Sequence, residues 1–214
     1  MTKKSLEERI QRLEDIHEIQ NLMGRYEYLH TAGLHEETAE LFAKKTPGVK
    51  ADLPGWGVYE GAEGIQRIYV RVHKYMEGDR IGQMYMHPLT TPVIEVAGDG
   101  KTAKGVWISP GHETAPDKDK LKAYWSWCKY GVDFVKEDGK WKFWHVQVYG
   151  IFYASYEKSW VEAPEAPSAA MPDELKGDRP NPHLWMYSPT AVTENIPAPP
   201  EPYETFDQKT AYVI

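Results

Sequence analysis

Apolar residues recur at steps of three and four along the first thirty positions, which is the spacing that lines one face of a helix. This stripe consists of Leu6, Ile10, Leu13, Ile16, Ile19, Met23, Tyr26 and Leu29. Ser5 followed by Glu8 has the spacing of a capping box, so we predict a helix over residues 5–31. Two shorter helices are expected over 35–43 and 62–76, separated by a glycine- and proline-containing loop with room for one short strand.

The pattern changes to a strand-like alternation at about residue 83. Asp-Gly pairs inside the segments 97–101 and 137–140 are strong hairpin signals, whereas the connection at 113–120 is longer and polar. Four strands are therefore predicted, over residues 83–97, 102–112, 121–136 and 141–156. Helices followed by an antiparallel meander indicate an α+β fold, with the N-terminal helices packed on a curved antiparallel sheet in one domain, residues 1–160.

Residues 161–214 differ from the rest of the chain because they contain ten of its sixteen prolines. Proline-rich backbone forms few hydrogen-bonded elements. The segment also contains Tyr187, Tyr203, Phe206 and Tyr212, which makes it too apolar for a free linker. We predict an extended arm that lies on a surface, either that of its own sheet or that of a neighbouring subunit.

Charge and composition exclude several classes of protein. The net charge is −7 and no concentrated basic surface is visible, so a nucleic-acid partner is not expected. No stretch approaches the ~20 apolar residues of a membrane span, and the N-terminus lacks the apolar run of a secretory signal, so we expect a cytoplasmic protein with no membrane contact. Cys128 is the only cysteine, which rules out an intrachain disulfide and a cysteine-based metal cluster. The 14 tyrosines and 8 tryptophans suit either a packed sheet or the lining of a pocket for flat ligands.

Three segments, ERIQRLEDIHEIQNLMGRYEYLHTAG, GVYEGAEGI and DGKWKFWHVQVY, resemble the SnoaL-like branch of the NTF2-like superfamily, and the resemblance covers about residues 5–157. It implies a cone-shaped α+β barrel with a pocket between the concave sheet and the helices. Superfamily members include scytalone dehydratase, polyketide cyclases and ketosteroid isomerase. In length and tail the chain is most similar to the diarylpropane lyases, which cleave lignin-derived diarylpropanes with loss of formaldehyde.

Two catalytic positions of the dehydratase members match this chain. These enzymes place a tyrosine after a Gly-Lys or Gly-Arg pair late in the first helix, where GRY supplies Tyr26. They place a histidine five residues before a strand-opening proline, where His87 precedes Pro92. Their two carboxylate positions do not match, because Thr31 and Gly111 stand there. The resemblance therefore implies Tyr26 and His87 as catalytic residues and counts against a carboxylate-assisted steroid dehydration.

Acid–base chemistry without a cofactor needs one group that protonates the leaving hydroxyl and another that accepts a proton. Histidine can serve in either role near neutral pH, and tyrosine can donate a hydrogen bond to an oxyanion. Tyr59 in GWGVYEG and Arg71 in GIQRIYVRVHKYM are further candidates, so the predicted catalytic set is His87, Tyr59, Arg71 and Tyr26. The alternative for Tyr59 is a packing role in a strand, and the alternative for Arg71 is a solvated helix face.

Five more residues are predicted to bind substrate in the pocket: His30, Trp107, His112, His145 and Gln147. His145 and Gln147 alternate with Phe143 on one face of the last strand, and the sequence does not say whether that face is solvated or lines the pocket. No H-x-H, H-E-x-x-H or two-histidine-one-carboxylate spacing lies on a single element, so neither a metal nor another cofactor is expected.

Together with the resemblance, these residues predict a cofactor-independent lyase for a small aromatic substrate. It would remove water and formaldehyde from a phenolic 1,2-diarylpropane-1,3-diol derived from lignin and leave a stilbene. The alternatives are a dehydratase or isomerase of a polycyclic or steroid-like substrate, and a non-catalytic member that binds a small apolar ligand. We also expect a homo-oligomer, with a trimer favoured over a dimer, because the outer face of such a sheet has apolar residues that need covering.

Overall fold

The computed structural model describes residues 5–117, 120–162, 171–181 and 186–213. Helix α1 (Leu6–Ala32) begins at the predicted capping box, in which the Ser5 hydroxyl accepts from Glu8 N and the Glu8 carboxylate accepts from Ser5 N. It ends at Gly33, whose φ of 70° is a left-handed conformation that glycine adopts without strain. The short helix α2 (His35–Ala39) follows at once.

The apolar stripe of α1 packs against the sheet only in its second half. Ile19 and Met23 are fully buried, whereas Leu6 and Leu13 are 65% and 67% exposed. The prediction of a single stripe is wrong for the first half, because Leu6 and Leu13 precede Met23 by numbers of residues that are not whole 3.6-residue turns. They therefore point roughly a quarter turn away from the buried face.

Residues 61–77 form one continuous helical stretch. It consists of α3 (Gly61–Gln66), a π-helical segment η1 (Arg67–Val72) and α4 (His73–Glu77). The loop before this stretch contains two short antiparallel strands rather than one, β1 (Lys50–Leu53) and β2 (Gly57–Glu60).

Seven strands form one sheet in the order β2-β1-β7-β6-β5-β3, and β4 pairs with the other end of β5. The later strands are β3 (Met84–Met86), β4 (Thr90–Val96), β5 (Thr102–Asp117), β6 (Lys120–Glu137) and β7 (Lys140–Ser155). The antiparallel meander with its two Asp-Gly turns is confirmed, but β1 pairs with β7 in parallel, so the sheet is mixed. Residues 113–117, predicted as part of a connection, instead extend β5, whose pairing with β6 continues to Asp117 opposite Lys120.

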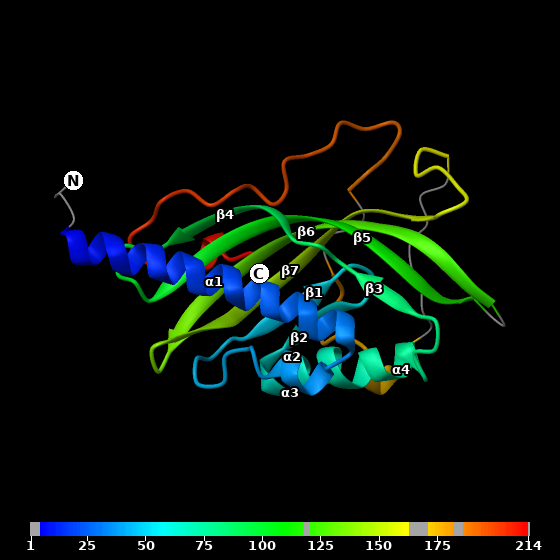
Figure 1. Ribbon diagram of the computed structural model, residues 1–214, viewed down its shortest axis with the longest axis horizontal. Helices are drawn as coiled ribbons and strands as arrows, with labels where there is room; N and C mark the ends of the chain where they lie inside the picture. The colour runs from blue at the N-terminus through cyan, green and yellow to red at the C-terminus, as the bar shows by residue number, and fades with distance from the viewer. Residues whose placement is uncertain (1–4, 118–119, 163–170, 182–185, 214) are drawn as a thin grey trace.

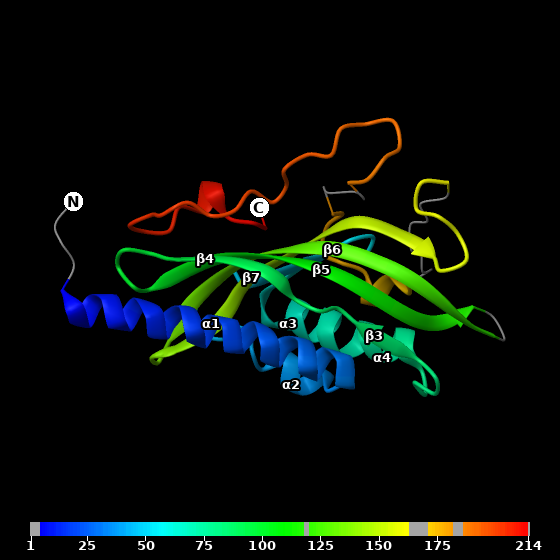
Figure 2. The same ribbon diagram turned by 45° about the horizontal axis from the view of Figure 1, so that its top comes forward.

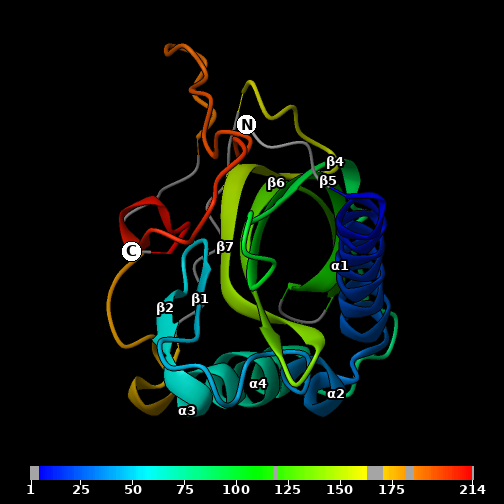
Figure 3. The ribbon, with the colours of Figure 1, turned by 90° about the vertical axis from the view of Figure 1, so that its left-hand side faces the viewer.

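The sheet is curved around a hydrophobic core but is not closed into a barrel (Figure 3). Helices α1 to α4 lie on its concave side, and residues 197–213 of the C-terminal arm lie on the opposite side (Figure 2). Ile68, Phe134 and Phe143 are fully buried where helices and sheet meet. The predicted α+β fold with a curved sheet is confirmed. Within the described residues, no helix is both long and apolar enough to cross a membrane.

Two β-bulges in β7 change which of its side chains face the concave side. The pairing of β6 with β7 shifts by one residue between Phe143 and His145, and again between Gly150 and Phe152. A bulge inserts one unpaired residue, so the alternation of faces restarts after it. For this reason Val148 and Tyr153, five positions apart, both line the same cavity.

At two described places the C-terminal arm contacts its own sheet, and part of the stretch between them stands away from the sheet (Figure 1). Met186 and Tyr187 donate backbone hydrogen bonds to Gly150 and Ile151 at 2.9 Å. Further along, Tyr212 N donates to the Asp133 carboxylate at 3.0 Å. The arm therefore makes hydrogen bonds to its own sheet at both of these places.

Candidate active site

A cavity of about 190 Å³ lies between the concave face of the sheet and the helices α1 and α4. Its apolar wall consists of Leu53, Pro54, Trp56, Met76, Ala115 and Val148. Its polar and aromatic groups are Tyr26, His30, His73, Glu77, Tyr85, His87, Glu113, Ser126, Cys128, Tyr130 and Tyr153. Three residues of the predicted set, Tyr26, His30 and His87, thus meet in one cavity.

His87 lies on the sheet side of the cavity, with 9% of its surface exposed. Its Nε2 is 3.4 Å from Oε1 of Glu113, and the Tyr153 hydroxyl donates to the other oxygen of that carboxylate at 3.2 Å. Burial alone would lower the pKa of His87, but its contacts with Cys128 and Glu113 outweigh burial and hold the pKa well above the ordinary histidine value. Burial raises the pKa of Glu113, and the contact with His87 outweighs this effect and lowers it. The raised pKa favours the protonated form of His87, which can act as an acid.

The backbone at His87 is held in place by its sequence neighbours and by α1. Strand β3 ends at Met86 and β4 begins only at Thr90, and Pro88 between them has no N–H for a strand ladder. The Glu27 carboxylate accepts the backbone N–H of His87 at 2.8 Å. The predicted strand 83–97 is thus interrupted at the histidine itself.

Gly111 of β5 leaves the space that the His87 ring occupies. A Cβ at position 111 would lie 2.5 Å from His87 Nδ1 and 2.2 Å from the Ser126 carbonyl oxygen. We therefore expect Gly111→Ala to displace the ring and to lower kcat for the substrate proposed below by about 10²-fold, since a misplacement of ~1 Å has that effect. Steady-state kinetics and thermal unfolding measure the two consequences separately. Gly24→Ala is the control, because nothing lies within 4 Å of its added Cβ, and full activity of a folded Gly111→Ala protein would contradict the prediction.

Two further histidines of the cavity are neutral at neutral pH. Burial, reinforced by neighbouring histidines, lowers the pKa of His30 well below its ordinary value, and burial lowers the pKa of His73 to about 4. The ring centroid of His30 lies 5.0 Å from that of His73 and 5.9 Å from that of His87. The cavity thus combines one imidazole with a raised pKa and two imidazoles with lowered pKa values. Neighbouring groups whose pKa values are pushed apart in this way can serve as an acid and a base.

The low pKa of His73 makes the stability of the fold depend on pH. Between pH 6.5 and 4, His73 binds a proton in the unfolded chain but stays neutral in the folded protein. The free energy of unfolding therefore falls as the pH falls through this window. At about 1.4 kcal/mol per pKa unit, we expect a loss of about 3 kcal/mol that a His73→Asn variant does not show. Urea unfolding of both proteins at pH 7 and pH 4.5 measures the difference. Equal losses in the two proteins would show that His73 is not buried in its neutral form.

Buried phenols line the α1 side of the cavity. The Tyr26 ring stacks on His30 at 5.8 Å and meets the edges of Tyr69 and Tyr130 at 5.9 and 6.2 Å. Burial raises the pKa of all three phenols, so they stay un-ionised. Tyr26 and Tyr130, which line the cavity, are hydrogen-bond donors there rather than bases.

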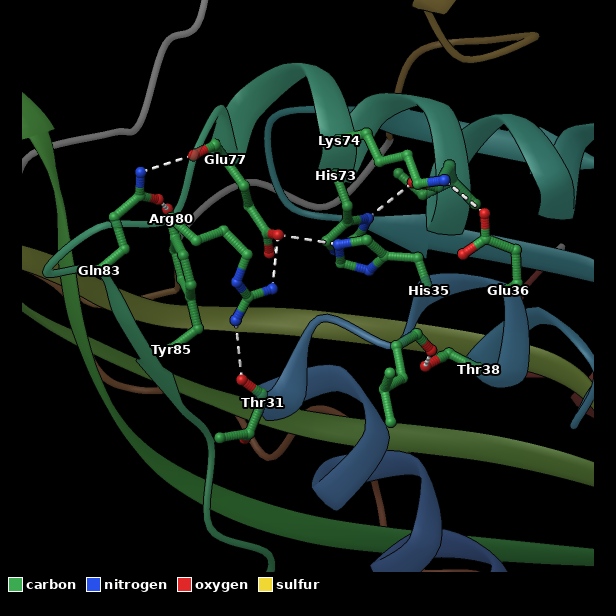
Figure 4. A network of polar contacts seen from close by, with 12 residues as sticks. Thr31, His35, Glu36, Thr38, His73, Lys74, Glu77, Arg80, Gln83 and Tyr85 are labelled. Carbon is green, nitrogen blue, oxygen red and sulfur yellow. Dashed lines mark hydrogen bonds and ion pairs between the residues drawn. The ribbon is translucent and has the colours of Figure 1, made fainter.

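A polar network closes the cavity on its helix side (Figure 4). Glu77 Oε2 accepts from His35 Nε2 at 2.8 Å and from Arg80 Nη1 at 2.6 Å, and Arg80 Nη2 donates to Thr31 O at 2.9 Å. Burial raises the pKa of Glu77, and the contacts with His35 and Arg80 outweigh it and lower the pKa. The network therefore places a carboxylate at the cavity wall whose charge is balanced by Arg80.

The structure places Tyr59 and Arg71, the other two predicted catalytic residues, away from the cavity. Tyr59 is fully buried, and its hydroxyl donates to Leu175 O of the arm at 2.8 Å, so it has the packing role. Arg71 is about half exposed and pairs with Glu63 on the solvated face of the helix, so it does not turn inward.

Four predicted substrate-binding residues also lie outside the cavity. Trp107 is buried against Gly105 and Phe134 in the core, and His112 lies on the outer face of β5 over Trp125. His145 and Gln147 are buried under the arm and beside β1, on the outer side of β7. The bulge after Phe143 puts the Phe143 side chain on one face of β7 and the side chains of His145 and Gln147 on the other. The predicted alternation, which put all three on one face, is therefore wrong.

The cavity brings together carboxylates that the sequence positions did not suggest. Gly111 and Glu113 share a face of β5 because they are two residues apart, so Glu113 supplies the carboxylate that position 111 lacks. Glu27, next to Tyr26, is an α1 carboxylate that accepts the backbone N–H of His87. The two-residue period was a usable signal for Glu113. No sequence signal pointed to His73, Glu77 or Tyr153, because only the tertiary fold brings them to the cavity wall.

Among the described residues, no group of three or more His, Cys, Asp or Glu side chains is arranged to hold a metal ion.

A curved mixed sheet with helices over its concave face and a cavity between them is the architecture of the NTF2-like superfamily. A model of the SnoaL-like domain family matches residues 11–147, so the chain belongs to that family, as the sequence predicted. A comparison with curated proteins finds no match.

Solved structures share this fold at low sequence identity. A proposed scytalone dehydratase from Novosphingobium aromaticivorans is 15% identical with a TM-score of 0.56, and the match covers 76% of this chain and 98% of that one. A hexachlorocyclohexane dehydrochlorinase, LinA type 2, is 16% identical with a TM-score of 0.57, covering 77% and 98%. A proposed NTF2-like dehydratase from Streptomyces avermitilis is 17% identical with a TM-score of 0.54, covering 64% and 96%. At these identities the likeness establishes the fold alone.

Proposed function

We propose that the chain is a cofactor-independent lyase that performs acid–base catalysis in the cavity between sheet and helices. The observation that supports this most is the pairing of His87 with Glu113 in the same cavity as His30 and His73, whose pKa values are shifted in the opposite direction to that of His87. An elimination needs an acid for the leaving group and a proton acceptor, and the cavity offers both. Structural neighbours named as dehydratases and a dehydrochlorinase are in keeping with an elimination.

The proposed substrate is a phenolic 1,2-diarylpropane-1,3-diol of lignin origin. The cavity wall offers the flat rings of Trp56, Tyr85 and Tyr130 to an aromatic ligand. The guanidinium of Arg80 is engaged by the cavity residue Glu77, which favours a neutral substrate over a carboxylate. In the first step the benzylic hydroxyl takes a proton from His87 and leaves as water. The phenol supplies the electrons and releases its own proton, so a neutral quinone methide remains.

A one-carbon assay tests this function. Metal-stripped protein is incubated with a panel of phenolic 1,2-diaryl-1,3-propanediols while formaldehyde and stilbene absorbance are recorded together. Appearance of both products in equal amounts supports the lyase. A requirement for added metal or nucleotide, or no product across the panel, would contradict it.

A second candidate is a dehydratase or isomerase of a polycyclic or steroid-like substrate. The sequence counted against it because two carboxylates were missing. Glu113 beside His87 restores one of them, and this observation favours water loss on the same site. The one-carbon assay separates the candidates, since a dehydratase releases water without formaldehyde. A non-catalytic ligand-binding protein would show neither product, and His87→Ala would leave its ligand affinity nearly unchanged.

We also propose that the protein forms homo-oligomers, with a trimer favoured over a dimer, and that it acts in the cytoplasm. The exposed apolar side chains of Leu6, Ile10 and Leu13 on α1 support association, because such a stripe is rarely left in water. Light scattering of the purified full chain measures the subunit number, and a monomer at micromolar concentration would contradict the oligomer.

A further inference from the structure

The helix wall of the cavity holds a histidine whose geometry suits the proton acceptor of the reaction. His73 lines the cavity at the first position of α4, directly after the π-helical segment η1. Its ring stacks on Tyr69 at 5.8 Å and meets the edge of Trp56 at 5.4 Å, so it is held between two aromatic residues. Only 5% of its surface is exposed.

The hydrogen bond of His73 determines which of its nitrogens can accept a proton. Nδ1 lies 2.7 Å from the carbonyl oxygen of Ile68, five residues earlier. A carbonyl oxygen can only accept, so the neutral ring has its proton on Nδ1 and a lone pair on Nε2. Five residues is also the separation of π-helical hydrogen bonds, and such segments are rare and frequently occur at functional sites. The local fold therefore locks His73 in the tautomer of a base.

An acidic group lies behind this base. The His35 ring centroid is 5.2 Å from that of His73, and His35 Nε2 donates to the Glu77 carboxylate at 2.8 Å. The Glu77 carboxylate favours the charged form of the His73 ring, whereas His35 opposes it. His73 is thus oriented by the Ile68 carbonyl, and the Glu77 carboxylate lies close enough to favour its charged form.

We propose that His73 is the catalytic base that completes the reaction, an inference that rests on the proposed lyase function. Its Nε2 takes the proton of the terminal hydroxymethyl group of the quinone methide. The electrons of that O–H bond form the carbonyl of formaldehyde while the carbon–carbon bond breaks. The electrons of the broken bond form the stilbene double bond and restore the phenolate, which solvent reprotonates. No oxidant or reductant is required.

His30 is the rival for this role, because it lines the same cavity and is also neutral. Its Nδ1 is buried and, among the described residues, has no hydrogen-bond partner. No hydrogen bond at Nδ1 fixes its tautomer within the described residues, and its ring stacks on Tyr26. We therefore assign the base to His73.

The test separates loss of water from loss of formaldehyde. In water enriched in ¹⁸O, a quinone methide that cannot lose formaldehyde adds water back and incorporates ¹⁸O at the benzylic carbon of the recovered diol. We expect His73→Asn to lower formaldehyde release by about 10²–10⁴-fold while ¹⁸O incorporation continues. His87→Asn should lose both signals, and His30→Asn should keep the wild-type ratio of the two. His17→Asn, an exposed histidine of α1, is the control for the substitution itself.

Each outcome decides the inference. Loss of formaldehyde release with continued ¹⁸O incorporation in His73→Asn alone supports the assignment of His73 as the base. Uncoupling in His30→Asn, or parallel loss of both signals in folded His73→Asn, overturns it and leaves the lyase function in place. Absence of both signals in the wild type overturns the proposed function and the inference with it. Independently of turnover, ¹⁵N shifts of the labelled full chain at pH 7 should show His73 neutral with its proton on Nδ1, and the opposite tautomer would also overturn the inference.

Discussion

Replacing His87 with asparagine should lower kcat for the phenolic diol by about 10²–10⁴-fold, the effect of removing a positioned general acid. Asparagine retains a polar group of similar reach but cannot deliver a proton. His87 is the one histidine of the cavity whose pKa lies well above its ordinary value, so no neighbour there replaces it as an acid at neutral pH. Formaldehyde and stilbene release under saturating substrate measure kcat directly.

The pH dependence of Glu113→Gln distinguishes an acid from a merely structural histidine. Activity that needs protonated His87 is complete below the His87 pKa and is lost as the pH rises through it. Glu113 helps to raise that pKa, so its removal should shift the alkaline limb of the kcat profile to lower pH. At pH values below the shifted limb, Glu113→Gln should retain most of its activity.

His112→Asn is the matched control, because this histidine is the strand neighbour of Gly111 and Glu113 on the opposite face. It should have wild-type kinetics. A folded His87→Asn protein with near-normal kcat, or an alkaline limb that Glu113→Gln does not move, would contradict the assignment of the acid.

The general fold was predictable because its signals are local. The capping box at Ser5 and the two Asp-Gly turns act within a few residues, and each occurs where predicted. The segment 113–120 was not predictable in this way, because its polar composition is also compatible with strand pairing beyond the core. Cross-strand hydrogen bonds there are independent of which side chains are apolar.

The candidate site was predictable only where chain position alone determines direction. Tyr26 and His87 were predicted because GRY and the histidine five residues before Pro92 resemble the dehydratase members, and His30 shares the inner face of α1 with Tyr26 because it lies four residues later. His145 could not be placed, because a single bulge reverses the face of every later residue and leaves no mark on the alternation. Glu77 and His73 enter the site through the packing of the helical stretch 61–77 against the sheet, which no local pattern encodes.

Asp133 lies at the centre of the contact between sheet and arm, and its loss should be the most destabilising change outside the core. It is fully buried, and its carboxylate accepts from Lys104 Nζ at 2.7 Å, His145 Nδ1 at 2.9 Å and Tyr212 N at 3.0 Å. Asp133→Ala leaves the Lys104 ammonium, 6% exposed, without its counter-charge. Breaking a buried pair from one side costs about 3–5 kcal/mol, which we expect as the loss in free energy of unfolding by urea.

The double variant Asp133→Leu with Lys104→Met separates the lost charge balance from lost packing. Removing both charges avoids the unpaired ammonium, so the double variant should recover most of the stability that Asp133→Ala loses. Lys44→Ala, which breaks an exposed pair with Glu40, should change stability by less than about 1 kcal/mol and serves as the surface control. The arm should also become a faster target for proteolysis in Asp133→Ala, since Tyr212 loses its acceptor. A double variant no more stable than Asp133→Ala would show that hydrogen bonding to the arm, rather than charge pairing with Lys104, holds this face of the sheet together.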